Sequence, residues 1–176
     1  MVHLSSTVPL AYGRKEAWGN LVRPGHAIYG YISPAKGASS PCLLEVHPAL
    51  SWKATVLEVK DIPAGAAIGY GGIHTTGRET RIAVLGVGYA DGYPHRLSNK
   101  GKVLLQGRAV PVLGAVSMDL TTVDASGLDV KPGDAATLLG TDGDESIDAQ
   151  QIAKLAGTIS YSVLCGISSR VVRLYV

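Results

Sequence analysis

Residues 81–93 read RIAVLGVGYADGY, and this stretch decides the fold of the chain. Its first part, residues 81–88, is a short and mostly apolar run that ends in glycine, which is typical of a buried strand. Directly after that strand, Tyr89 opens a loop that contains glycine. A strand end holds a phenol rigidly, so its hydroxyl can face a cleft. The alternative is a tyrosine packed on the core, with its hydroxyl bonded to backbone.

Strand patterns recur on both sides of this stretch. Residues 53–60 alternate apolar and polar side chains, which is the period of a half-buried strand. We expect further strands at residues 102–105, 109–116, 120–124, 135–139 and 170–176. Proline followed closely by glycine predicts chain reversals at residues 62–65 and 131–134. Short strands separated by frequent turns predict a mainly β fold, either a barrel or a sandwich.

Two local signals refine this pattern. Gln106-Gly107-Arg108 separates two of the expected strands and is a plausible short hairpin link. Pro111 lies inside the second of those strands, and proline has no N–H to donate to a neighbouring strand. We therefore expect an edge strand or a bulge at Pro111.

One helix is expected near the end of the chain. Asp148 predicts its N-terminus, because Gln151 stands three residues later and completes a capping box. Ile147 and Ile152 fit a hydrophobic staple, and Gly157 predicts the C-terminus. We expect this short helix to flank or plug the barrel.

The composition excludes several classes of protein. A chain of 176 residues with 46% hydrophobic and 17% charged residues suits one ordinary domain, or one domain with a fragment of another. The net charge of +2 and the absence of Lys or Arg runs argue against nucleic-acid binding. No apolar stretch approaches the roughly 20 residues of a membrane span, and residues 1–5 have no basic stretch leading into an apolar core, so we expect no secretory signal there. Cys42 and Cys165 form no CxxC pair, so we expect reduced, buried thiols in a cytoplasmic protein and no metal site.

The N-terminal part of the chain has a different character. Residues 21–30 (LVRPGHAIYG) are apolar on both sides of an Arg-Pro-Gly turn, whereas residues 14–18 are more polar. We interpret residues 1–37 as the remnant of a larger domain and residues 38–176 as the β domain, with a linker between them. The apolar strand at 21–30 is expected to pair with another chain, to pack against the β domain or to be disordered.

Three segments, in this order, resemble the C-terminal part of bacterial alanine racemases. They are residues 88–93 (GYADGY), residues 116–119 (VSMD) and residues 161–171, which follow a Y-x-x-x-C-x-I-S-x-R-V pattern. Residues 21–30 resemble the last strand of that family's N-terminal barrel and the turn after it. The resemblance implies a pyridoxal 5'-phosphate-binding (β/α)8 barrel, of which residues 1–37 are the remnant, followed by a mainly β domain. It also implies a cytoplasmic homodimer that interconverts L- and D-alanine, the latter a peptidoglycan precursor.

The resemblance assigns cofactor contacts to Arg23, Gly25, His26, Tyr161 and Thr7. The arginine corresponds to the residue that hydrogen-bonds the pyridine nitrogen, and its permanent charge keeps that nitrogen unprotonated. Backbone N–H groups of Gly25 and His26 correspond to phosphate ligands at a helix start. The hydroxyls of Tyr161 and Thr7 correspond to further phosphate ligands, with Ser6 as the alternative to Thr7.

The resemblance assigns the chemistry to Tyr89 and the substrate carboxylate to the backbone of Met118. Racemisation removes a proton from one face of the α-carbon and returns one to the other, so it needs two bases. Tyr89 corresponds to one base, acting across the dimer interface on the other subunit's cofactor. The second is the Schiff-base lysine, and no lysine of this chain stands in that context. We therefore expect the isolated chain to be inactive without a lysine-bearing barrel.

Other functions stay open at this point. The chain could be a non-catalytic β-barrel dimerisation module, the β domain of a fold-type III decarboxylase, or the racemase domain of a serine or broad-specificity amino-acid racemase. The joint presence of Tyr89, Arg23 and Tyr161 argues against a module without a site to serve. The VSMD and GYADGY segments suit a racemase better than a decarboxylase, and alanine and serine remain equally open as substrates.

Overall fold

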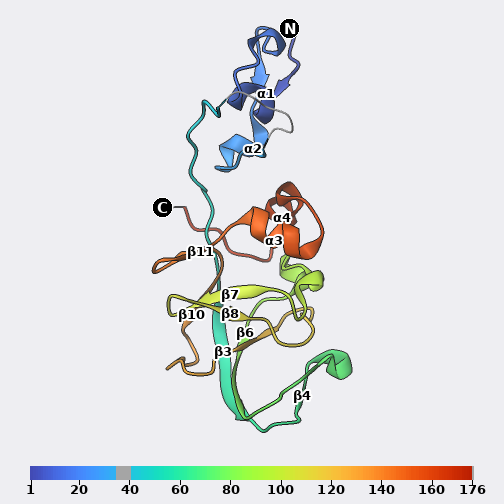
Figure 1. Ribbon diagram of the computed structural model, residues 1–176, viewed down its shortest axis with the longest axis vertical. Helices are drawn as coiled ribbons and strands as arrows, with labels where there is room; N and C mark the ends of the chain where they lie inside the picture. The colour runs from blue at the N-terminus through green and yellow to red at the C-terminus, as the bar shows by residue number, and fades with distance from the viewer. Residues whose placement is uncertain (35–40, 176) are drawn as a thin grey trace. The chain divides into compact units, whose positions relative to one another are not determined.

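The computed structural model describes residues 1–34 and 41–175 and divides the chain into two compact units (Figure 1). Unit 1 spans Met1–Leu50 and unit 2 spans Ser51–Val176. The boundary expected between residues 37 and 38 falls in the segment 35–40, which lies outside the described residues.

Unit 1 contains two short parallel strands, each followed directly by a helix. Its elements are β1 (Ser5–Ser6), α1 (Thr7–Ala11), the 3-10 turn η1 (Lys15–Ala17), β2 (Val22–Arg23) and α2 (Gly25–Ile28). Ser5 lies opposite Val22 in the parallel pair. Pro24 ends β2, because proline cannot donate to a neighbouring strand. The strand is therefore much shorter than the one expected at 21–30, and it pairs with β1 inside unit 1.

Unit 2 is built mainly of antiparallel strands. Its strands are β3 (Trp52–Ile62), β4 (Ala67–Ile68), β5 (His74–Thr75), β6 (Thr80–Leu85), β7 (Lys102–Leu105), β8 (Arg108–Pro111), β9 (Thr121–Asp124), β10 (Ala135–Asp142) and β11 (Glu145–Ile147). Its helical elements are η2 (Tyr70–Gly72), η3 (Tyr89–Asp91), η4 (His95–Leu97), α3 (Ala149–Ala156) and α4 (Ser160–Gly166). The mainly β fold predicted from the sequence is confirmed.

The main sheet of unit 2 closes into a barrel. Its strands follow the order β8-β7-β10-β3-β6-β9, with β11 paired to β10. The chain beyond β8 returns to the other edge, where Val112 pairs with Val123 and the Leu113 N–H donates to the Thr122 carbonyl at 2.8 Å. Pro111 occupies the end of β8, an edge strand of this order, as predicted. These contacts join the chain after β8 to β9, the strand at the opposite end of the order, and so close the barrel.

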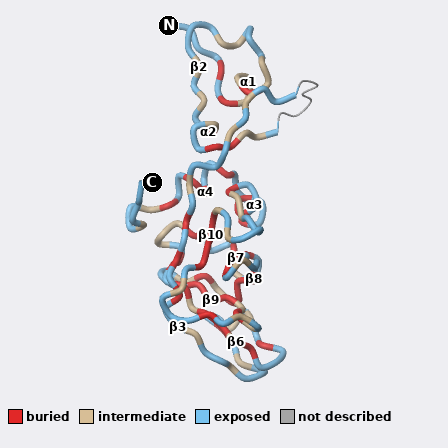
Figure 2. Tube along the Cα trace, turned by 90° about the vertical axis from the view of Figure 1, so that its left-hand side faces the viewer, coloured by how far each residue is buried: buried red, intermediate tan, exposed pale blue. Residues whose placement is uncertain are grey.

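Alternation along the strands builds the core. In β3, Trp52, Ala54 and Val56 are buried and the residues between them are exposed. In β7, residues 103–105 are all fully buried, so this part of the strand has no side chain facing solvent. Buried positions accordingly gather along β3, β6, β9 and β10 in Figure 2. The turn after β7 is the predicted hairpin link, in which Gln106 and Gly107 both have positive φ, as a two-residue turn requires.

The expected helix is present, and a second helix follows it. The Asp148 carboxylate accepts from the Gln151 N–H at 2.7 Å and the Gln151 side chain accepts from the Asp148 N–H at 2.8 Å, so the capping box is confirmed. Gly157 ends α3 in the left-handed conformation, as predicted. The second helix, α4, was not predicted; in it the buried residues 160, 163 and 164 follow a helical spacing. None of the described helices is both long and apolar enough to cross a bilayer.

Two expectations near the C-terminus and at the cysteines were wrong. Residues 170–175 form no strand; instead the Arg173 guanidinium donates to the carbonyls of Ser168, Val171 and Ile167, which folds the segment on itself. Cys42 and Cys165 are free but exposed rather than buried. Cys165 is exposed because Val163 and Leu164 form the inward face of α4.

Candidate active site

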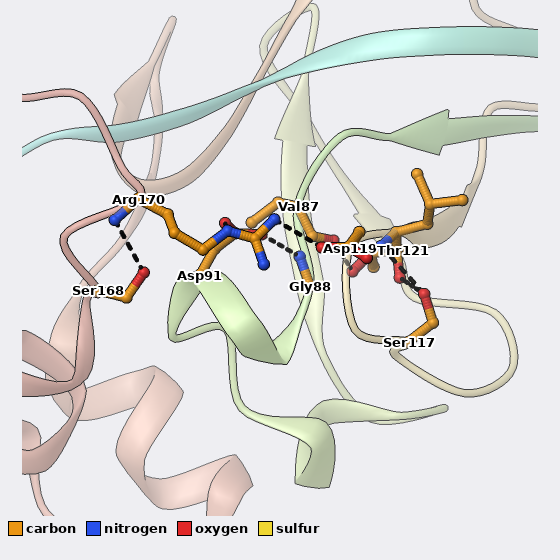
Figure 3. Close-up of polar contacts among 9 residues, drawn as sticks. Val87, Gly88, Asp91, Ser117, Asp119, Thr121, Ser168 and Arg170 are labelled. Atoms are coloured by element: carbon orange, nitrogen blue, oxygen red, sulfur yellow. Dashed lines mark hydrogen bonds and ion pairs between the residues drawn. The ribbon is translucent and has the colours of Figure 1, made fainter.

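Three segments that are distant in the sequence meet on one face of unit 2. The Tyr89 N–H donates to the Ser117 carbonyl at 2.9 Å, and the Ala90 N–H donates to the Met118 carbonyl at 3.0 Å. The Ser168 N–H donates to the Asp91 carbonyl at 2.9 Å. These bonds join the loop after β6, the segment before β9 and the chain after α4. Labelled residues of the same three segments lie close together in Figure 3. The structure thus brings together Tyr89, which the resemblance assigns as a base, and Met118, which it assigns to the substrate carboxylate.

Glycine is required at two positions of the GYADGY segment. A Cβ on Gly88 would overlap the carbonyl oxygens of Ser117 and Met118. Gly92 has a φ of 102°, and a Cβ there would overlap the Gly166 carbonyl oxygen. Only glycine permits both the left-handed conformation and such a close approach of two backbones. The two glycines therefore let the tyrosine loop pack flat against both neighbouring segments.

A group of charged side chains connects the same three segments. The Asp91 carboxylate accepts from the Gly88 N–H at 2.9 Å and so closes the turn that carries Tyr89. The Arg170 Nε lies 3.4 Å from Asp91 Oδ1, and its Nη2 lies 2.6 Å from Asp119 Oδ1 (Figure 3). The hydrogen bond to Asp119, and then the charge of Asp91, raise the pKa of Arg170. Asp119 and Arg170 belong to two of the motifs that carry the family resemblance, but the resemblance assigns neither of them a role.

Tyr89 is accessible to solvent. Its side chain begins η3 and is 46% exposed, and its ring meets the His95 ring edge-on at 6.0 Å. Met118 on the adjoining segment is exposed as well. Tyr89 is therefore not a core tyrosine, whereas Tyr93, four residues later, is packed in the core and 1% exposed. Tyr89 therefore has the accessibility that a residue acting on an external substrate needs.

A second exposed tyrosine, which the sequence analysis passed over, lies beside the same segment. Tyr70 begins η2 and is 78% exposed. Gly69 and Gly71 flank it, each with a φ of 71°. A Cβ on Gly69 would lie 3.2 Å from the Ala115 N atom, so this turn packs on the segment that leads to Met118. The signal that could have found it is the Gly-Tyr-Gly-Gly run, since closely spaced glycines mark a tight and rigidly placed turn.

Unit 1 places other predicted residues at the ends of its two parallel strands. Thr7 follows β1 and is buried, and its Oγ1 accepts from the Ala27 N–H at 3.2 Å. Gly25 begins α2 directly after β2, and a Cβ there would meet nothing within 4 Å. Parallel strands bring their carboxyl ends to the same edge, so the hydroxyl of Thr7 and the first turn of α2 adjoin. Arg23, exposed at the end of β2, lies at this edge too, and exposed Ser6 immediately precedes Thr7.

His26 takes part in this arrangement through its backbone. Its side chain is buried and its ring stacks on Tyr31, with ring centroids 5.5 Å apart. Burial lowers the pKa of His26, so its ring is neutral at neutral pH. The side chain therefore packs the unit, while the backbone N–H of His26 lies in the first turn of α2. Tyr161, the remaining predicted phosphate ligand, belongs to α4 of unit 2 and is partly exposed.

These features define a class of protein: a closed antiparallel β-barrel domain with a tyrosine-bearing loop face, preceded by a β/α segment. Residues 49–175 match the family model described as "Alanine racemase, C-terminal domain". The chain therefore belongs to the alanine racemase family.

Individual relatives agree with this assignment. The alanine racemase of Symbiobacterium thermophilum is 48% identical over 161 residues, which cover 91% of this chain and 42% of the relative. The crystal structure of alanine racemase from Bacillus anthracis with bound L-Ala-P superposes with a TM-score of 0.87 at 35% identity, covering 97% of this chain and 43% of that one. The Bartonella henselae alanine racemase with covalently bound pyridoxal phosphate has a TM-score of 0.81 at 34% identity, covering 98% and 46%. The chain thus spans less than half the length of these relatives.

Proposed function

We propose that this chain is the C-terminal part of an enzyme that interconverts L- and D-alanine with pyridoxal 5'-phosphate, and that it supplies a tyrosine base. The observation that carries the proposal is the meeting of the Tyr89 loop and the Met118 segment on one exposed face, in a member of the alanine racemase family. Two solved relatives, described as holding L-Ala-P and covalently bound pyridoxal phosphate, support the substrate and the cofactor.

The residues of unit 1 fit the phosphate and pyridine groups of that cofactor. A buried hydroxyl on Thr7, open space over Gly25 and the first-turn N–H groups of α2 form a set of donors that suits a phosphate. The Arg23 guanidinium suits a neutral ring nitrogen, because it donates hydrogen bonds and does not give up its proton. The cofactor, when bound, supplies a sink for the negative charge that remains after loss of the α-proton. We propose that Thr7, Gly25 and His26 hold the phosphate, with the hydroxyl of Tyr161 added to them.

The arrangement of unit 1 supports its origin in a barrel. Two parallel strands that each lead straight into a helix follow the β/α order of a (β/α)8 barrel, whose sites lie at the carboxyl ends of the strands. We propose that residues 1–37 belong to the cofactor-binding barrel and residues 38–176 to the β domain. Every lysine among the described residues is exposed, and none adjoins Thr7 or Gly25 in sequence. We therefore propose that another polypeptide segment supplies the lysine that serves as the second base.

In unit 2, we propose that Tyr89 exchanges the α-proton and that the backbone N–H of Met118 binds the substrate carboxylate. The Met118 carbonyl accepts from the Ala90 N–H, which fixes the orientation of that segment relative to Tyr89. Because the tyrosine acts on a cofactor held elsewhere, we propose that the assembled enzyme is a homodimer in which it reaches the partner's site. Tyr70 is a second candidate for the base, favoured by its greater exposure and its rigid turn beside the same segment.

Reconstitution tests the proposal. The purified chain is incubated with pyridoxal phosphate and L-alanine, alone and with a lysine-bearing N-terminal barrel from a relative, and D-alanine is measured. We expect turnover only with the barrel present. Clear turnover by the chain alone would refute the need for an added lysine. If no turnover occurs with the barrel, although the two parts bind each other, the racemase function is wrong.

Matched tyrosine variants then locate the base. Tyr89→Phe removes one hydroxyl, and we expect it to lower kcat by at least about a hundredfold, the usual range for a lost general base. Tyr70→Phe tests the second candidate, and Tyr175→Phe is the control, because that tyrosine is 94% exposed in the C-terminal segment. Full activity in Tyr89→Phe with a large loss in Tyr70→Phe would move the role to Tyr70. Parallel assays with L-serine decide the substrate.

A further inference from the structure

Arg170 lies where three segments meet: the tyrosine loop after β6, the Ser117–Asp119 segment before β9 and the chain after α4. We call the surface formed by these three segments the loop face. It follows α4, 51 residues after Asp119 and far from Asp91 in sequence, yet its guanidinium contacts both carboxylates. Nη2 is 2.6 Å from Asp119 Oδ1 and Nε is 3.4 Å from Asp91 Oδ1. In Figure 3 the side chain of Arg170 runs between the Asp91 loop and the Asp119 segment, and joins them directly.

Each of the two aspartates is tied to a residue that we place in the site. Asp91 accepts from the Gly88 N–H, so it holds the turn in which Tyr89 is the next residue. Asp119 directly follows Met118, in a short turn closed by the Ser117 hydroxyl, which accepts from the Leu120 N–H at 3.0 Å. The two carboxylates are therefore short extensions of the tyrosine loop and of the carboxylate-binding segment.

The exposure of the shorter ion pair points to orientation rather than to global stability. The side chains of Arg170 and Asp119 are about half exposed, and exposed pairs contribute little to folding because water and salt screen them. The side chain of Asp91 is only 14% exposed, so its pair with Arg170 is less screened and holds the tyrosine loop more firmly. An arginine, however, presents several donors in one rigid plane, and it can meet two carboxylates from different directions at once. A lysine offers a single ammonium on a flexible stem. At this site one guanidinium aligns two acceptors, the carboxylates of Asp91 and Asp119, and a lysine ammonium cannot do so with the same rigidity.

We propose that Arg170 is a positioning residue, which fixes the Tyr89 loop relative to the Met118 segment. Its two carboxylate contacts supplement the two backbone hydrogen bonds between Tyr89–Ala90 and Ser117–Met118. Loss of the guanidinium lets the two segments open independently and leaves the barrel closed. The consequence for catalysis rests on the proposed function, whereas the positioning itself is a property of this chain alone.

Amide hydrogen exchange on the chain tests the positioning without any assay of activity. The probes are the N–H groups of Tyr89 and Ala90, which bridge the two segments, and the reference is the Leu113 N–H at the barrel closure. In Arg170→Gln we expect exchange at the two probes to rise at least tenfold, with less than a twofold change at the reference. In Arg170→Lys, exchange at the two probes should rise by an intermediate amount. Arg78→Gln, which removes one exposed charge elsewhere on unit 2, should change neither.

Two results would overturn the proposal. Unchanged exchange at Tyr89 and Ala90 in Arg170→Gln would show that the backbone bonds alone hold the segments. An equal rise at Leu113 would show that Arg170 stabilises the whole domain and not the loop face. Asp119→Asn provides an independent variant, because it breaks the shorter of the two contacts and should raise exchange at the same two amides.

The reconstituted racemase supplies the catalytic readout. We expect Arg170→Gln to lower kcat about tenfold and to raise the KM for alanine, because both the base and the carboxylate-binding segment lose their alignment. Arg170→Lys should change kcat and KM less than Arg170→Gln does. Wild-type kinetics in Arg170→Gln would refute the catalytic consequence. If the unmodified chain gives no turnover with any barrel, the proposed function fails, while the exchange result still decides the positioning role.

Discussion

Tyr93→Phe is the substitution for which the structure makes the sharpest prediction. The ring of Tyr93 is 1% exposed and meets Trp52 edge-on, with centroids 6.0 Å apart and an interplanar angle of 77°. Its hydroxyl finds no hydrogen-bond partner in the part of the chain that the structure describes. A Cβ on Gly101 would lie 3.1 Å from that oxygen, so glycine leaves the space that the hydroxyl fills. Phenylalanine keeps the ring contacts and removes only the oxygen.

The expected gain follows from the unmet hydrogen bond. A buried polar group without a partner destabilises the folded state by about 1–3 kcal/mol. Removal of the oxygen also leaves a small void, which offsets part of the gain because its lining loses contacts. We therefore expect Tyr93→Phe to raise the free energy of unfolding at pH 7 by about 1 kcal/mol, the low end of that range.

The same burial makes the stability depend on alkaline pH. Desolvation raises the pKa of Tyr93 well above its usual value near 10. Below pH 10 both folded and unfolded chains keep the proton, and this contribution to stability is fully present. Above pH 10 the unfolded chain releases the proton while the folded chain retains it, so stability falls by about 1.4 kcal/mol per pH unit. Phenylalanine has no proton to lose, and its advantage over tyrosine grows accordingly.

Urea unfolding, followed by circular dichroism at pH 7 and pH 11, measures both effects. The control is Tyr175→Phe, because that tyrosine is exposed in the C-terminal segment and lies outside the core. We expect the stability difference between Tyr93→Phe and the unmodified chain to widen by about 1.4 kcal/mol from pH 7 to pH 11. A variant less stable than the unmodified chain at pH 7, or a difference that does not change with pH, would refute this reasoning.

Two further substitutions test the local structure. Gly88→Ala places a methyl group against the carbonyls of Ser117 and Met118 and should destabilise unit 2 by about 2 kcal/mol or more, measured by urea unfolding. In the same variant the Tyr89 amide should also lose its protection from hydrogen exchange. A variant with unchanged stability and unchanged exchange would show that the two backbones can separate freely. Asp148→Ala removes the N-cap of α3 and should lower the free energy of unfolding by about 1 kcal/mol. Asp148→Asn keeps a capping oxygen and should retain most of that stability. Equal losses of stability in the two variants would contradict the capping role.

Local patterns in the sequence were sufficient for most of the barrel. The alternation in residues 53–60 predicts β3, because a half-buried strand sorts its side chains by period two. Gln106-Gly107 predicts a hairpin, and Asp148 with Gln151 predicts a helix start. In each case the residues that decide the structure are neighbours, so the physical cause lies within a few positions. Resemblance of three motifs to a family similarly indicated the alanine racemase relationship that the comparisons bear out.

Local patterns did not predict the secondary structure where an apolar run was compatible with more than one kind of element. Residues 170–176 have the β-branched and apolar composition of a strand, but the Arg173 guanidinium binds nearby carbonyls and the described part of the segment joins no sheet. Residues 160–166 form α4, a helix that was not predicted, although its buried residues Ser160, Val163 and Leu164 follow a helical spacing. The choice in both places depends on which surface is available to pack against, and that surface comes from elsewhere in the chain.

The sequence by itself determined most strands of the barrel, the cap of α3 and the family, because short-range sterics, hydrogen bonds and side-chain periodicity act between neighbouring residues. Only the tertiary structure decided that Gly88 must be glycine, that Val112 and Val123 close the barrel, and that Arg170 bridges Asp91 and Asp119. These three facts concern groups that are far apart along the chain. Their contacts exist only after the sheet has closed and has brought the three loop segments to one end of the barrel.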